Sequence, residues 1–135
     1  MHASATFTVA GFTPTAVPSP EVTTALAVGV STMSKHYDGE VEGRSATLFT
    51  AAYDQASGTG TYVAMESFEG TLHGRRGTFN FAHSATTTGS DRQDEFFTIV
   101  PGSGTDELTG ITGAGAIAVD ADGTHRITFD YELDR

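Results

Sequence analysis

The sequence contains no cysteine, which excludes disulfide bonds, thiolate zinc sites and cysteine nucleophiles together. Basic residues are also scarce, since seven Lys and Arg stand against 17 Asp and Glu and the formal net charge is −10. A surface of this sign repels phosphate backbones and anionic membranes, so we expect neither nucleic acid nor a membrane as a partner. The simplest consequence of the acidic surface is solubility.

Long apolar segments are missing as well. No apolar run approaches the roughly 20 residues that a membrane-spanning helix needs. Residues 1–9 lack the basic start and the apolar stretch of a secretory signal, so the sequence predicts a cytoplasmic protein. The 135 residues correspond to one domain, residues 1–135, and no stretch has the composition of a linker.

The residues that are abundant favour β-structure. Thr, Val, Phe and Tyr recur along the chain, and 16 glycines punctuate it. No window of helical length has a strong apolar stripe with a period of 3.6 residues. Alternation of apolar and polar residues predicts about eight strands, with a proline-containing loop at 12–21 and a charged loop at 91–95. The expected strands are 3–9, 26–37, 41–52, 60–68, 78–85, 95–100, 114–120 and 125–133.

A weak internal repeat indicates how these strands could close into a barrel. Residues 37–45 (YDGEVEGRS) resemble residues 68–76 (FEGTLHGRR), and a fainter copy occupies 108–113 (LTGITG). Each copy places glycines at a strand corner, where positive φ or a bulge is needed. Such corners let a sheet curl and close, which removes exposed edges. We therefore expect an all-β fold, a single antiparallel eight-stranded barrel, with a tight hairpin turn at Asp122 and Gly123.

Three segments resemble a bacterial family of small uncharacterised proteins. They are residues 60–79 (GTYVAMESFEGTLHGRRGTF), 100–108 (VPGSGTDEL) and 127–131 (ITFDY), and the resemblance extends over nearly the whole chain. That family is similar in fold to allene oxide cyclases and dirigent proteins, which are eight-stranded antiparallel barrels. The resemblance implies an internal cavity, a hydrophobic small-molecule ligand and assembly into homodimers or homotrimers. Because one fold serves many functions, the activity has to be argued from individual residues.

Familiar motifs for cofactors and nucleophiles are missing. The chain has no GxxxxGK[ST] phosphate loop and no GxSxG nucleophile elbow, and the glycines of 110–115 do not precede an expected helix. None of the five histidines has HxH or HExxH spacing. We therefore expect no metal and no cofactor.

Ionisable residues on otherwise apolar strand faces are the candidate site. Three faces combine one such residue with aromatic residues: Glu66 with Tyr62 and Phe68, His83 with Phe79 and Phe81, and His125 with Phe129 and Tyr131. If these faces line the barrel, the lumen is aromatic with a few polar groups, which suits a small molecule. Desolvation should raise the pKa of Glu66 towards neutrality. We expect Glu66 and His83 to be catalytic and the other seven residues to contact the substrate.

Each of these residues also has a structural interpretation. The opposite face of segment 60–68, with Val63 and Met65, is nearly as apolar, so Glu66 could point outward. His83 could be a hydrogen-bonded core histidine, and His125 an exposed residue after a turn. The phenylalanines are expected to pack in the hydrophobic core, and they line a cavity only if the barrel contains one.

Three functions are compatible with this pattern. The first is a cofactor-independent cyclase or isomerase acting on a hydrophobic, natural-product-like intermediate, with Glu66 exchanging the proton and His83 and Tyr62 assisting. The second is a non-catalytic barrel that binds or orients a hydrophobic molecule. The third is an interaction protein, since the side chains of a barrel of about eight strands are just large enough to fill it. We rank the enzyme first and the filled barrel last.

Overall fold

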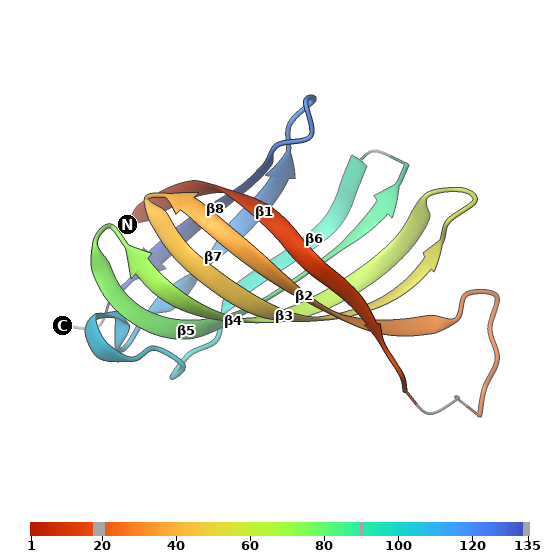
Figure 1. Cartoon of the computed structure of the whole chain (residues 1–135), viewed down its shortest axis with the longest axis horizontal. Helices are drawn as coiled ribbons and strands as arrows, with labels where there is room; N and C mark the ends of the chain where they lie inside the picture. The colour runs from red at the N-terminus through yellow and green to blue at the C-terminus, as the bar shows by residue number, and fades with distance from the viewer. Residues whose placement is uncertain (18–20, 90, 134–135) are drawn as a thin grey trace.

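Eight strands form a closed antiparallel ring in the computed structural model, which describes residues 1–17, 21–89 and 91–133. The elements are β1 (His2–Thr15), β2 (Val28–Gly39), β3 (Val41–Asp54), β4 (Thr59–Leu72), β5 (Arg75–Thr88), β6 (Asp91–Ile99), the 3₁₀ turn η1 (Asp106–Leu108), β7 (Thr112–Val119) and β8 (His125–Glu132). Each strand pairs with the next, and β1 also pairs with β8 (Figure 1). The predicted all-β, eight-stranded antiparallel architecture is confirmed. None of the described residues belongs to a helix long and apolar enough to span a membrane.

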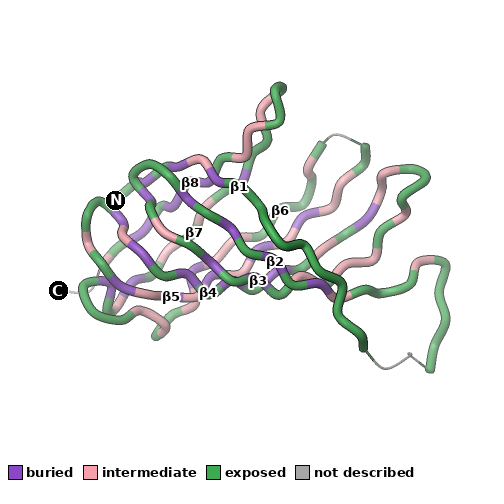
Figure 2. The backbone as a smooth tube through the Cα atoms, in the orientation of Figure 1, coloured by how far each residue is buried: buried purple, intermediate pink, exposed green. Residues whose placement is uncertain are grey.

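Alternation along the strands directs every second side chain into the ring. Buried and exposed residues alternate along the greater part of β2 and β4, whereas the second half of β1 is exposed throughout (Figure 2). On β4, Ala64, Glu66 and Phe68 are buried, whereas Val63 and Met65 are exposed. Glu66 therefore lies on the inner face of β4. The sequence alone did not distinguish the inner from the outer face, because the two are nearly equally apolar.

One end of the ring contains a solid apolar core. The turns β2–β3 and β4–β5 lie at this end, and the segment around η1 closes it with the buried side chains of Leu108 and Ile111. Gly77 on β5 allows this segment to approach, because a Cβ atom there would lie 2.3 Å from the carbonyl oxygen of Thr105. At the opposite end, the hairpins β3–β4, β5–β6 and β7–β8 extend beyond the core (Figure 1).

Glycine corners curve the sheet as the repeat predicted. Gly43 and Gly70 are register partners on β3 and β4, with φ of 148° and 155°. A Cβ atom on Gly43 would lie 2.2 Å from the carbonyl oxygen of Glu69. Only glycine combines this backbone conformation with such a close approach.

Two predicted loops turn out to be strand. β1 continues to Thr15 through a bulge beside Gly11, whose φ is 64°, so the loop predicted at 12–21 is wrong for residues 12–15. Within the described part of the chain, β1 beyond Phe7 pairs only with β2, and an edge of this kind tolerates a proline such as Pro14. Residues 18–20 of that predicted loop lie outside the described residues.

The charged segment 91–95, predicted as a loop, is the first half of β6. It pairs with β5 through Asp91, Arg92 and Gln93. On its other side, β6 is joined to β7 by the single pair Ile99–Gly113. Charged residues are common on strands with such an open edge, so their presence did not indicate a loop.

Candidate functional site

Glu66 is the centre of a buried polar cluster at mid-height in the ring. Its side chain has no solvent exposure. Lys35 Nζ and His83 Nε2 each lie 2.5 Å from Oε2, and the hydroxyl oxygens of Tyr37 and Ser45 each lie 2.7 Å from Oε1. These donors come from β2, β3 and β5, so strand register assembles the group. We call these five residues the Glu66 cluster.

The cluster keeps Glu66 ionised, which corrects the expectation of a raised pKa. Burial alone raises the pKa of this carboxyl, but the hydrogen bond from His83 and the charge of Lys35 outweigh it and lower the pKa to about 2. The expectation was wrong because it counted desolvation alone and left out the contributions of His83 and Lys35. Glu66 can therefore accept hydrogen bonds at neutral pH, but it has no proton to donate.

His83 connects Glu66 to Tyr62. Burial lowers the pKa of His83, so its imidazole is neutral at neutral pH. The carboxylate of Glu66 requires the ring proton on Nε2, which leaves the lone pair of Nδ1 to accept the hydroxyl proton of Tyr62 at 2.7 Å. Burial raises the pKa of Tyr62, so the phenol is protonated, and Arg92 Nη2 donates to its oxygen at 2.9 Å.

A pocket of about 620 Å³ lies beside Tyr62, at the end of the ring opposite η1. We call it the open-end pocket. Its lining comprises Phe12, Ala27, Gly29, Ser31, Phe49, Ala51, Tyr53, Gln55, Gly60, Tyr62, Thr87 and Gly89. All of these side chains are uncharged. Phe49 stacks on Tyr62 with ring centroids 5.0 Å apart, and Phe12 meets Phe49 edge-on. The volume lies within the roughly 300–1,000 Å³ typical of small-molecule sites.

The structure joins three of the predicted site residues by hydrogen bonds and leaves the other six outside the open-end pocket. Glu66, His83 and Tyr62 form one hydrogen-bonded series, and Tyr62 also lines the open-end pocket. Five predicted substrate contacts lie instead in the apolar core: Phe68, Phe79, Phe81, Phe129 and Tyr131. Of these, Phe81 is the register partner of Glu66, and its ring stacks on that of His83 with centroids 5.9 Å apart. None of these five lines the open-end pocket.

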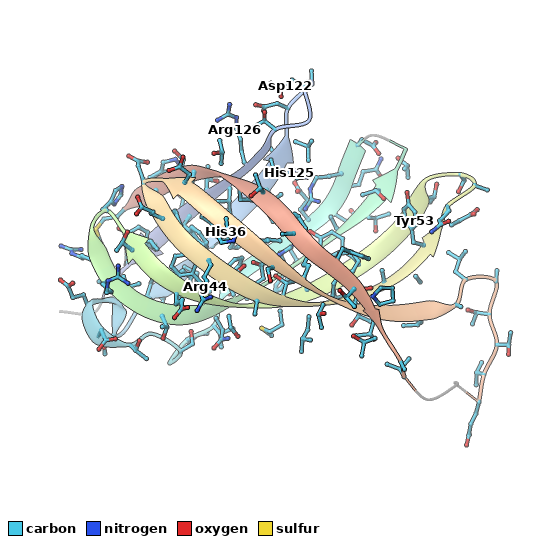
Figure 3. All side chains as sticks on the ribbon, in the orientation of Figure 1. His36, Arg44, Tyr53, Asp122, His125 and Arg126 are labelled. Atoms are coloured by element: carbon cyan, nitrogen blue, oxygen red, sulfur yellow. The ribbon has the colours of Figure 1, made fainter. Side chains whose placement is uncertain are left out.

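His125 also lies outside the open-end pocket. It begins β8, where Figure 3 labels it near the β7–β8 hairpin, and its ring packs 5.2 Å from that of Phe7. Among the residues that the structure describes, no three His, Asp or Glu side chains are grouped so that they could hold a metal ion. Of the nine predicted site residues, Tyr62, His83 and Glu66 are thus the three that hydrogen bonds connect to one another.

Sequence reasoning missed the donors that surround Glu66 and Tyr62. Lys35 alternates with Met33 and Tyr37 on the inner face of β2, so a lysine on an apolar face was a readable signal of a buried charge. Arg92 lies in the segment 91–95, for which the sequence predicts a charged loop, so nothing in the sequence indicates its contact with Tyr62. Gly29 and Phe49 line the open-end pocket but have no ionisable group, so the sequence did not mark them as site residues.

The chain matches a known protein family. A family model described as "Protein of unknown function (DUF3224)" matches residues 3–131. The chain belongs to the DUF3224 family. Its fold is similar to the crystal structure of a DUF3224 protein of unknown function from Shewanella oneidensis MR-1, with 30% sequence identity and a TM-score of 0.83. That match covers 100% of this chain and 98% of the other.

No curated protein matches the chain. The expectation of an uncharacterised family is confirmed. Because family membership supplies no activity, the function has to be argued from the geometry of the site.

Proposed function

We propose that this DUF3224 protein binds a small, neutral, largely apolar molecule in the open-end pocket and catalyses proton transfer on it, as an isomerase or cyclase. The observation that carries the proposal is the hydrogen-bonded series Tyr62–His83–Glu66, which links a pocket-lining phenol to an ionised, buried carboxylate. We call this series the relay.

In this proposal Tyr62 is the group that touches the substrate. A C–H bond of the substrate breaks, and its proton passes to the oxygen of Tyr62 while the hydroxyl proton of Tyr62 passes to Nδ1 of His83. The carboxylate of Glu66, 2.5 Å from Nε2, stabilises the imidazolium that forms. The electron pair left on the substrate is delocalised as an enolate. Return of the proton to a different atom completes an isomerisation with no change in oxidation state.

The remaining polar residues hold the relay in position. Lys35, Tyr37 and Ser45 direct the carboxylate of Glu66 by hydrogen bonds, so His83 meets an acceptor of fixed orientation. Arg92 donates to the oxygen of Tyr62 and so holds the phenol in position. Glu66 is therefore an electrostatic and positioning group in this proposal, and not the proton donor.

Deuterium exchange into a simple carbon acid tests the catalytic step. 2-Tetralone, an enolisable apolar ketone, is incubated with the protein in deuterated buffer, and loss of its α-proton signals is followed by NMR. We expect the protein to accelerate exchange, and Tyr62→Phe to reduce the acceleration about 100-fold or more. Exchange no faster than in buffer alone would contradict the catalytic step.

Gly29 offers a matched control for the location of the site. A Cβ atom on Gly29 meets no heavy atom within 4 Å, so Gly29→Leu should fill the open-end pocket without a clash. Val28, its exposed neighbour, provides the control substitution Val28→Leu. Gly29→Leu should abolish exchange and Val28→Leu should preserve it. Equal activity in the two variants would place the reaction elsewhere.

A non-catalytic binding barrel is the second candidate. It is favoured by the hydrogen bonding of Glu66, whose carboxylate is fully buried and accepts hydrogen bonds from four donors. A polar cluster with a purely structural role would have the same features. N-phenyl-1-naphthylamine, a neutral fluorescent ligand, distinguishes the candidates. Fluorescence enhancement that Gly29→Leu abolishes, together with no exchange of 2-tetralone, would favour binding alone. No enhancement would favour the filled barrel.

A further inference from the structure

The hydroxyl of Tyr62 donates its proton in a hydrogen bond to His83. The Nε2 proton of His83 points to the carboxylate of Glu66 at 2.5 Å, so Nδ1 carries a lone pair. The hydroxyl of Tyr62 lies 2.7 Å from this lone pair and has to donate to it. The opposite ring tautomer would set a lone pair of Nε2 against the carboxylate, where the two would repel each other.

Rotation of the Tyr62 hydroxyl away from His83 is also unfavourable. Nδ1 is buried with its ring, and Tyr62 is the donor that the structure gives it. A buried acceptor left without its donor costs the full desolvation penalty of that group. The hydroxyl proton therefore stays on the His83 side when a ligand enters.

The oxygen of Tyr62 can consequently offer a ligand only an acceptor. One of its two lone pairs receives the hydrogen bond from Arg92 Nη2 at 2.9 Å. The second lone pair has no partner among the described residues. A ligand group that reaches this oxygen gains a hydrogen bond if it carries O–H or N–H, and it meets lone-pair repulsion if it is an ether or a carbonyl oxygen.

The other polar side chains of the open-end pocket do not impose this preference. Ser31, Tyr53, Gln55 and Thr87 can each both donate and accept, so they accommodate ligand oxygens of either kind. The uncharged lining and the net charge of −10 both disfavour an anionic ligand. Tyr62 is thus the group that distinguishes donors from acceptors.

We propose that the open-end pocket selects a neutral apolar molecule whose polar end is a hydrogen-bond donor, such as an alcohol, a phenol or an enol, and that Tyr62 reads this group. The selectivity rests on the proposed binding function of the pocket and is independent of catalysis.

A pair of matched ligands tests the selectivity. 2-Naphthol and 2-methoxynaphthalene share one apolar body, and only the naphthol can donate. We expect equilibrium dialysis at neutral pH to give about tenfold tighter binding of 2-naphthol, which corresponds to about 1.4 kcal/mol. Tyr62→Phe should remove the preference while both ligands still bind.

Tyr53→Phe is the matched control, because Tyr53 lines the same pocket and its hydroxyl is not part of the relay. It should leave the tenfold preference intact. If 2-naphthol is not preferred, or if the preference persists in Tyr62→Phe, the proposed selectivity is wrong, but the proposed binding function of the open-end pocket is unaffected. If neither ligand binds, or if Gly29→Leu binds both as well as the native protein does, the proposed binding function falls together with the selectivity.

Discussion

Replacement of Glu66 by glutamine tests whether the Glu66 cluster is ionised. The substitution keeps the shape of the side chain and removes its charge. The amide can still bond all four partners if its oxygen faces Lys35 and His83, because the hydroxyls of Tyr37 and Ser45 can turn to accept. The principal loss is therefore the charge that balances Lys35, whose side chain is only 6% exposed.

The expected cost of Glu66→Gln follows from that uncompensated charge. Removing one partner of a buried ion pair typically destabilises a protein by about 3–5 kcal/mol. The lowered pKa gives a consistent figure, because a change from 4.5 to about 2 corresponds to about 3 kcal/mol of folding free energy. We predict a loss of about 3 kcal/mol for Glu66→Gln.

Urea unfolding at neutral pH measures this loss. With a slope of about 2 kcal/mol per molar urea, the midpoint should fall by about 1.5 M. Glu69→Gln is the matched control, because Glu69 lies on the same strand in an exposed ion pair with Arg44, which Figure 3 labels on the ring, and such a pair contributes about 1 kcal/mol or less. The double variant Lys35→Met/Glu66→Gln should be more stable than Glu66→Gln alone. A cost below about 1 kcal/mol for Glu66→Gln would refute the ionised cluster.

Two further predictions concern the same interior. Acidification should reduce the free energy of unfolding in two steps, because the folded protein binds protons less readily than the unfolded chain at both His83 and Glu66. The loss due to His83 begins below pH 6.5, and the loss due to Glu66 accumulates from pH 4.5 down to about 2. Urea midpoints measured across this range check the sign, and the first loss should disappear in His83→Gln but persist when the exposed His36 is replaced by glutamine. Thr47→Val should leave stability unchanged or raise it by about 1 kcal/mol, because the buried Thr47 hydroxyl has no hydrogen-bond partner among the residues that the structure describes; a loss above about 1 kcal/mol in thermal unfolding would contradict this expectation.

Local patterns predicted the strands well and their partners poorly. The alternation of Ile127, Phe129 and Tyr131 with polar residues is a local property of the chain, and β8 appears where that alternation occurs. Alternation also put Glu66 and His83 on faces with aromatic residues, and the structure joins them. The segments assigned wrongly, 12–15 and 91–95, lie on partly unpaired edges where proline and charge are tolerated.

The charge partner of Glu66 could not be found in the same way. Lys35 reaches Glu66 because β3 lies between their strands with a fixed register on both sides. This register depends on turns and glycine corners distributed over the whole ring. The pKa of Glu66 therefore depends on long-range geometry, and the sequence alone gave the wrong direction.

The division of the interior explains why the predicted aromatic contacts are not at the pocket. Inward-facing Phe79 and Phe49 are equivalent in sequence pattern, yet Phe79 is buried in the core and Phe49 lines the open-end pocket. Which end is filled depends on the η1 segment, which contributes Leu108 and Ile111 to one end only. Alternation gives the face of a residue, but not its height in a barrel.

The position of the Glu66 cluster gives the strongest reason to assign it more than a structural role. An apolar filling at this level would be at least as stable, because burying charges costs desolvation energy that their attraction only partly returns. The cluster nevertheless lies between the solid core and the open-end pocket, and its hydrogen bonds continue through His83 to Tyr62 in the pocket lining. A cluster needed only for packing would not have to reach the pocket. The connection to Tyr62 therefore favours a site in which the solid half holds the charges rigid and the hollow half holds the ligand.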